Sequence, residues 1–310
     1  MEDDAANALP AEIAGSIQAI RDDREHGASW LARAAAQTLL HANVQTEGMP
    51  DVRRDAILRA AARALVTARP SMAAVANAAA RVWSAGVVTS ATTRWQAMHG
   101  MAERLASPDG QERQALIDHA EKLVAGSVYT LSRSGTVEDV LLALGRRGAV
   151  TKLFIAESRP GGEGVALAQA LATGGLPVTL VADAACGVFM AEVNCVVLGA
   201  DSLRADGSVV NKVGSYPLAL MAHAEGKPVY VICETLKIAA PDFPFALEEM
   251  DPAELLPDAV EGIAARNPYF DMTPATLIAS YITEKGILDR ETIARYSQAA
   301  GSALASLSAS

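Results

Sequence analysis

The chain has 310 residues, a formal net charge of −10 and an apolar content of 51%. That length suits one large domain or two ordinary ones, and the apolar content is ample for a large core. The negative charge argues against a nucleic-acid surface, which needs a basic face. The acidic N-terminus lacks the order of a signal peptide, and no apolar run approaches membrane-spanning length. The composition therefore predicts a cytoplasmic protein that binds neither nucleic acid nor membrane.

The first part of the chain is predicted to be helical. Helices fit residues 12–21, 28–40, 52–68, 71–84, 88–107 and 109–124. The first of them places Ile13, Ile17 and Ile20 on one face, which is the apolar stripe of an amphipathic helix. We interpret residues 1–125 as a helical N-terminal domain with a capping or packing role.

At Gly126 the pattern changes to short β-branched runs that alternate with helical segments. The strand-like runs are residues 127–131, 152–156, 177–181, 195–198 and 229–233. The helical segments between them are residues 137–146, 163–173, 184–192 and 216–225. Such alternation predicts βαβ units and a doubly wound parallel sheet. The predicted fold class is therefore α/β, with a helical N-terminal domain followed by a Rossmann-like domain over residues 126–310.

Two expectations concern the C-terminal part of the chain. Thr273 and Pro274 have the order of a helix cap and a first helical residue, so a helix is expected to begin there and to end at Gly286. Residues 301–310 are small and polar enough to fray.

The three cysteines, Cys186, Cys195 and Cys233, lack metal-ligand spacing. They are predicted to be reduced core thiols, and no metal site is expected.

The stretch from 195 to 225 concentrates the chemistry. Residues 196–198 are apolar enough for a central strand covered on both faces. Asp201 follows that strand at its carboxyl end, where open α/β sheets bind ligands. Asn211 and Lys212 come next, and a helix opens at Gly214. A carboxylate, an amide, an ammonium and a helix N-terminus together suit a small phosphorylated molecule.

Other loops at the same predicted sheet edge carry matching groups. Arg133, Arg159 and Lys212 are placed to converge on one phosphate, and residues 134–136, beginning with Ser134, add hydroxyl and backbone donors at a helix start. The alternative is that each charge is a solvated loop residue. Four loops with matching chemistry, residues 132–136, 157–162, 183–185 and 201–212, favour the site.

A dinucleotide site fits poorly. Gly162 and Gly164 lie between a strand and a helix, but Leu167 stands where the fingerprint needs a small residue. Glu163 would also place a negative charge against a pyrophosphate. No cofactor is therefore predicted.

The sheet part resembles a known family in four ordered motifs. They are ESRP at 157–160, GAD at 199–201, DGSVVNKVGSY at 206–216 and NPYFD at 267–271 with its continuation to Gly286. These motifs resemble the regulatory-subunit (alpha, beta, delta) family of translation initiation factor 2B. That superfamily also contains ribose-1,5-bisphosphate isomerase and methylthioribose-1-phosphate isomerase. A weaker match at 26–28 resembles the Arg-Gly-Ala phosphate loop of the isomerases.

The resemblance implies a sugar-phosphate pocket between the two domains and assembly into dimers or larger oligomers through the C-terminal domain. It implies phosphate binding by Arg159, Asn211, Lys212 and the backbone amides of Gly27 and Ala28. Asp201 would contact a sugar hydroxyl or act as acid and base.

Three positions depart from the isomerases. Ser132 stands in place of their catalytic cysteine, Glu163 in place of a usual Gln, and His26 in place of an Arg. An alcohol exchanges protons less readily than a thiol, whose reference pKa is about 8.5. The isomerase chemistry is therefore expected to be impaired while the pocket is kept.

The sequence thus favours an initiation-factor-2B-like protein that binds a phosphorylated sugar or a related metabolite, without standard isomerase chemistry. One alternative is an aldose–ketose isomerase acting on a sugar 1-phosphate, with Asp201 as acid and base and Ser132 or a water in place of the thiol. Another is a regulatory or assembly subunit with an empty pocket.

Overall fold

The computed structural model describes residues 9–89, 93–107, 110–244, 246 and 248–308. The chain divides into two compact units, which are treated separately. The first, helical unit comprises Met1–Asp109, Leu236–Pro244 and Ala294–Ser310. The second, sheet unit comprises Gly110–Thr235 and Phe245–Ile293. Compared with a single boundary after residue 125, this division assigns residues 110–125 to the sheet unit and the C-terminal residues to the helical unit.

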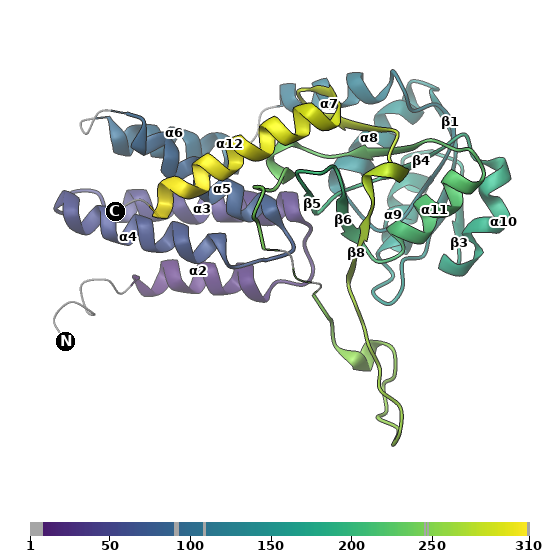
Figure 1. Cartoon of the computed structure of the whole chain (residues 1–310), viewed down its shortest axis with the longest axis horizontal. Coiled ribbons are helices and arrows are strands. Elements are labelled where there is room, and N and C mark those ends of the chain that lie inside the picture. Colours follow the sequence, from purple (N-terminus) through teal and green to yellow (C-terminus); the bar gives the residue numbers. More distant parts are fainter. Residues whose placement is uncertain (1–8, 90–92, 108–109, 245, 247, 309–310) are drawn as a thin grey trace. The chain divides into compact units, whose positions relative to one another are not determined.

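The helical unit is built on helices (Figure 1), and its buried residues are rich in alanine. Its N-terminal helices are α2 (Ala11–Asp22), α3 (Ala28–Gln45), α4 (Asp51–Val66), α5 (Ala73–Val87) and α6 (Arg94–Ala106). The predicted stripe of Ile13, Ile17 and Ile20 is buried on α2, as expected. Small side chains along α3 and α5 are almost all buried, which lets the helices approach one another closely.

The C-terminal tail is helical, so the expectation that it frays is wrong for the residues described. It forms α12 (Arg290–Ser308), whose later part belongs to the helical unit. The Arg63 guanidinium donates to the Leu307 carbonyl at 2.7 and 2.9 Å, and the Trp83 indole donates to the Ser306 carbonyl at 3.2 Å. These contacts cap and anchor the last turn, which overrides the weak preference of a small, polar sequence for helix.

The sheet unit contains a parallel sheet. Within the described residues its strand order is β10-β9-β7-β4-β1-β2-β3. The strands are β1 (Gly126–Thr130), β2 (Val150–Ala156), β3 (Val178–Val181), β4 (Cys195–Leu198), β7 (Val229–Ile232), β9 (Ser280–Thr283) and β10 (Gly286–Leu288). All neighbours pair in parallel except β10 with β9. β4 is completely buried and central, so the predicted parallel sheet and its central strand are confirmed.

Two layers cover this sheet. One face carries Val128, Leu153 and Val197, which pack in a cluster with α7 (Gly110–Ala120), α8 (Gly135–Arg146) and α9 (Glu163–Thr173). The opposite face carries Tyr129 and Phe154, and Phe154 lies 5.6 Å from the ring of Phe189 on α10 (Cys186–Phe189). The other helix between strands, α11 (Ser215–Ala224), lies between β6 and β7 in the sequence. Alternate strand residues therefore face opposite layers.

A small antiparallel sheet is inserted after β4, and it was not predicted. Its strands are β5 (Ser202–Leu203), β6 (Val209–Lys212) and β8 (Phe270–Thr273), in that order. The β5–β6 turn contains Gly207 at φ +84°, where a side chain would be strained. The Asp206 carboxylate accepts from the Ser208 backbone N–H at 2.9 Å and closes the turn. This hairpin carries Asn211 and Lys212.

The prediction of a helix from Thr273 to Gly286 is wrong. The segment instead forms the end of β8, a short 3₁₀ turn at Ala275–Leu277, and then β9. Thr273 pairs with Val209 across the small sheet, and Ile282 pairs with Ile232 across the large one. Long-range strand pairing outweighed the local Thr-Pro cap signal.

The predicted cysteine environment is confirmed for two residues. Cys195 and Cys233 are buried, Cys186 is half-buried, and all three are free thiols. Burial raises the pKa of the Cys195 thiol to about 11, so it stays protonated at neutral pH. None of the described helices combines the length and apolar character that a bilayer crossing requires.

Candidate functional site

The site is built at the carboxyl edge of the large sheet, from residues of the sheet unit alone. Asp201 lies just beyond β4, and its backbone N–H donates to the Val210 carbonyl of β6 at 2.8 Å. A Cβ added at Gly199 would lie 3.2 Å from Ser134 Cβ and 3.7 Å from Asn211 Oδ1. The end of β4 therefore brings two predicted site residues, Ser134 and Asn211, close to the backbone that leads to Asp201.

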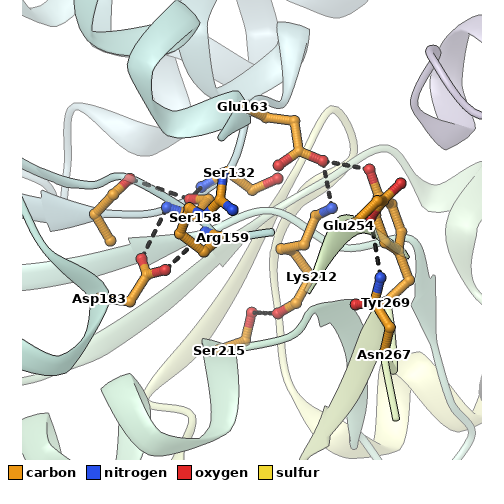
Figure 2. Close-up of polar contacts among 11 residues, drawn as sticks. Ser132, Ser158, Arg159, Glu163, Asp183, Lys212, Ser215, Glu254, Asn267 and Tyr269 are labelled. Carbon is orange, nitrogen blue, oxygen red and sulfur yellow. Dashed lines mark hydrogen bonds and ion pairs between the residues drawn. The ribbon is translucent and has the colours of Figure 1, made fainter. Parts of the chain in front are cut away.

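Ser158 joins the loops that follow β1 and β2 (Figure 2). It is buried with φ +63°, and its hydroxyl accepts from the Ser132 backbone N–H at 2.6 Å. Ser132 is also in the left-handed region, at φ +60°. Two non-glycine residues in this conformation, held by one hydrogen bond, mark a backbone that the surrounding structure fixes in place.

Asp183, which follows β3, locks the second of these loops. Its two carboxylate oxygens accept from the backbone N–H groups of Ser158, at 2.8 Å, and Arg159, at 2.7 Å. The carboxylate is therefore used in holding the turn that presents Arg159. This role accounts for both carboxylate oxygens of Asp183 within the protein.

Gly164 sets the position of α9 over the end of β2. A Cβ added there would lie 1.8 Å from the Ala156 carbonyl oxygen, so no side chain fits. Because the helix packs directly on the strand, its first residue, Glu163, is held at the sheet edge. The dinucleotide fingerprint needs a small residue at position 167 so that helix and strand can pack closely. Here Gly164, three residues before Leu167, allows that packing.

Lys212, Glu163 and Tyr269 form a compact group, which we call the Lys212 cluster (Figure 2). The Lys212 ammonium and the Tyr269 hydroxyl both donate to the same oxygen of Glu163. The ammonium also lies 3.0 Å from the centroid of the Tyr269 ring, close enough for a cation–π contact. The Lys212 side chain is only 5% exposed. The Glu163 carboxylate and the Tyr269 ring thus compensate the charge of the buried Lys212 ammonium.

Burial has opposite effects on the two proton donors of the cluster. It lowers the pKa of Lys212, and the neighbouring Glu163 carboxylate opposes this change. It raises the pKa of Tyr269 well above its ordinary value, and the Glu163 carboxylate adds to that rise. The tyrosine is therefore a phenol at neutral pH and donates to Glu163.

Arg133 and Ser134 both contact the first turn of α8. The Arg133 guanidinium donates to Glu138 in the first turn at 3.1 Å, and the Ser134 hydroxyl accepts from the Val137 backbone N–H at 3.4 Å. Arg133 is half-exposed, and Arg159 is exposed. The three predicted cations therefore differ: Arg133 and Lys212 are paired with carboxylates, whereas the structure fixes Arg159 through its backbone.

The N-terminus of α11 was predicted to help bind the ligand, and the structure fills it with a side chain. One oxygen of Asp271 accepts from the backbone N–H groups of Gly214, at 2.8 Å, and Tyr216, at 3.0 Å. Asn211 is buried and donates to the Ser215 hydroxyl at 2.8 Å. A carboxylate from β8 thus occupies the anion-binding end of this helix, which corrects that part of the expected site.

Asp271 should make stability depend on pH. Burial raises its pKa from 3.8 to about 6, against the stabilising backbone hydrogen bonds. The folded state therefore binds a proton more tightly, so this residue's stabilisation is present below pH 3.8 and is lost as pH rises through 6. The difference between the two pKa values corresponds to about 3 kcal/mol.

The test compares native protein with Asp271→Asn, which keeps an oxygen acceptor without the charge. From pH 4 to pH 7, the free energy of unfolding of the variant minus that of native protein is expected to rise by about 2.4 kcal/mol. Urea unfolding at each pH measures it, with the exposed Asp258→Asn as the matched control. A difference that stays constant with pH would contradict the assignment.

Gly27 and Ala28 belong to the helical unit. Gly27 is the N-cap of α3 and Ala28 is its buried first residue. The preceding His26 stacks on Trp30 with ring centroids 3.8 Å apart, and its Nδ1 lies 2.7 Å from the Asp23 carboxylate. Asp23 also accepts from the His26 backbone N–H at 2.8 Å. The loop before α3 is therefore rigidly held.

Glu163 and Tyr269 are the residues that sequence reasoning did not place in the site. Tyr269 lies in the NPYFD motif, and Glu163 was noted only as a departure from a usual Gln. Their contacts with Lys212 span large sequence separations, so no local pattern reports them. Among the described residues, no group of three or more His, Cys, Asp or Glu side chains is arranged to hold a metal ion.

Taken together, the fold and the site define an α/β protein whose parallel sheet presents a polar, partly buried site at its carboxyl edge. The chain belongs to the Initiation factor 2 subunit family, whose sequence profile matches residues 24–290. The family resemblance seen in the motifs is thereby confirmed.

Similar proteins span nearly the whole chain. A 5-deoxyribose 1-phosphate isomerase from Moorella thermoacetica is 33% identical over 311 residues, covering 90% of this chain and 86% of the relative. A ribose 1,5-bisphosphate isomerase from Archaeoglobus fulgidus is 30% identical over 287 residues, covering 90% of each. The solved structure of translation initiation factor eIF-2B from Pyrococcus horikoshii has a TM-score of 0.77 at 28% identity, covering 90% of this chain and 98% of that one.

Proposed function

We propose that this protein is an isomerase that converts a ribose-type sugar 1-phosphate into the corresponding ketose 1-phosphate. The observation that carries the proposal is similarity over nine-tenths of the chain to two proteins named as sugar-phosphate isomerases. Asp201, at the carboxyl end of the central strand, agrees with it. The isomerase reading, held as an alternative from the sequence, thus has more support than binding alone.

The reaction requires proton transfers at both carbon and oxygen. The bond between C1 and the ring oxygen breaks, one hydrogen moves from C2 to C1, and a carbonyl forms at C2. The ring oxygen gains a proton and the C2 hydroxyl loses one, so no oxidant or reductant is consumed. We assign Asp201 as a proton donor and acceptor in this sequence, with Ser132 or a water in the place of a thiol.

Sugar-phosphate binding is assigned to the neighbouring loops. Arg159 is exposed on a turn that Asp183 holds rigidly, so its guanidinium is available to a phosphate. Ser134 contributes through the start of α8, and Arg133 lies beside it. Asn211, on β6, lies close to Gly199 at the end of β4 and is the further candidate for this role.

The test uses native protein with 5-deoxyribose 1-phosphate and ribose 1,5-bisphosphate, the sugars in the names of the two relatives. Formation of the C2 carbonyl is followed by carbon-13 NMR, and binding by the shift in thermal unfolding. We expect at least one sugar to be bound and converted. Lack of conversion by concentrated enzyme would contradict the proposal.

The second candidate is a sugar-phosphate-binding protein without turnover. Ser132 favours it, because this position offers an alcohol where the isomerases use a thiol. The same experiment separates the two, since this candidate predicts thermal stabilisation by a sugar phosphate and no product.

We also expect the protein to form at least a homodimer through its sheet unit. The segment 251–266 of this unit extends away from the strands (Figure 1) and exposes Leu255, Val260 and Ile263. Light scattering at micromolar concentration should give at least twice the chain mass of 32.2 kDa. The mass of a single chain would contradict this expectation.

A further inference from the structure

The Lys212 cluster has a charge balance that is unusual for a phosphate site. The ammonium of Lys212 is already bonded to Glu163 and lies against the Tyr269 ring. Two further carboxylates, those of Asp201 and Glu254, act electrostatically on both Lys212 and Tyr269. Within this group, three carboxylates therefore act on one ammonium.

Glu254 is held in this arrangement by hydrogen bonds. It ends the short 3₁₀ turn Pro252–Glu254, whose start is capped by Asp251. The buried Asn267 side chain donates to the Glu254 carboxylate and to the Asp251 carbonyl, each at 3.0 Å. Figure 2 shows Glu254 beside Tyr269. Asn267 therefore holds the carboxylate of the exposed Glu254 in this position.

Glu163 also offers an unused acceptor. One of its oxygens receives Lys212 and Tyr269, whereas the other is buried and has no hydrogen-bond partner among the described residues. A buried carboxylate oxygen without a donor is costly, so a ligand that donates to it gains affinity. A sugar hydroxyl is such a donor. A phosphate dianion has only acceptors and adds negative charge.

We propose that the Lys212 cluster, which the family resemblance alone would assign to phosphate, instead binds the unphosphorylated end of the sugar, with Glu163 accepting from a hydroxyl, and that it excludes a second phosphate. The preferred ligands are therefore pentose monophosphates with their phosphate at C1, in preference to 1,5-bisphosphates. This inference rests on the proposed function and specifies which substrates it takes. It assigns Glu163 as the residue that sets specificity.

The experiment measures dissociation constants by titration calorimetry at pH 7.5 for ribose 1-phosphate and ribose 1,5-bisphosphate. Native protein is expected to bind the monophosphate at least about tenfold more tightly, because the second phosphate would meet uncompensated carboxylates. In Glu163→Gln this ratio should fall by about tenfold or more, since the charge is removed while the shape is kept. Glu192→Gln is the matched control. It breaks an exposed Lys–Glu pair, Lys152 with Glu192 at 2.9 Å, near the opposite end of β1, and should leave the ratio unchanged.

Native protein alone tests the inference, whatever the stability of the variant. Equal affinities, or tighter binding of the bisphosphate, would overturn it. An unchanged ratio in folded Glu163→Gln would overturn it as well, as would a loss confined to kcat for both sugars, which would make Glu163 a proton-transfer group. These results leave the proposed function intact if product still forms. Failure of native protein to bind either sugar would instead overturn the proposed function itself.

Discussion

Asp201→Asn is expected to lower kcat for sugar 1-phosphate isomerisation by about 10² to 10⁴, the usual loss for one acid–base group. Asparagine has nearly the same shape as aspartate but neither accepts nor releases a proton at neutral pH. The loop should keep its course, because the bond from the residue 201 backbone N–H to the Val210 carbonyl does not involve the side chain. The dissociation constant for the sugar should therefore change little.

The measurement is ketose formation under saturating substrate, with calorimetric titration for affinity. Asp118→Asn serves as the matched control, because Asp118 accepts from Arg147 at 3.1 Å on the surface of α7. It should turn over substrate like native protein. Native-like turnover by Asp201→Asn would show that Asp201 transfers no proton in the rate-limiting step. A parallel loss of affinity would instead make it a binding residue.

Five strands of the large sheet, β1, β2, β3, β4 and β7, could be predicted because each has an apolar, β-branched run that is recognisable from neighbouring residues alone, whereas β9 and β10 were not predicted. Val196 and Val197 are β-branched residues in an uninterrupted apolar run, which is what a strand buried on both faces requires. Once that strand was recognised, Asp201 followed at its carboxyl end by topology alone. This part of the site depends on one strand and the residues immediately after it.

The small sheet and the Lys212 cluster could not be predicted in the same way. β6 is four residues long and becomes a strand because it pairs with β8, about sixty residues later in the chain. Likewise, Glu163 meets Lys212 and Tyr269 only through packing of α9, where Gly164 leaves no room for a side chain. Asp271 was recognised within a family motif, but its role in capping α11 required the β6–β8 register.

Ser132→Cys is expected to raise the isomerisation rate of native protein by at least about tenfold. A thiol with a reference pKa of about 8.5 exchanges protons near neutral pH far more readily than an alcohol. The substitution should be tolerated, because the hydrogen bond to Ser158 comes from the backbone N–H of residue 132. The left-handed conformation at φ +60° costs serine and cysteine alike, since both have a Cβ.

Ser132→Ala gives the baseline that makes this comparison decisive. If the native hydroxyl takes no part in proton transfer, Ser132→Ala should match native protein, and Ser132→Cys should exceed both. Alkylation would follow the new thiol, because Cys195 and Cys233 are buried and only Cys186 is partly exposed. Equal rates in all three proteins would contradict the prediction and place the second proton-transfer group elsewhere. A rate that falls in Ser132→Ala and is not raised in Ser132→Cys would show instead that the native alcohol, in this fixed backbone conformation, already performs the step.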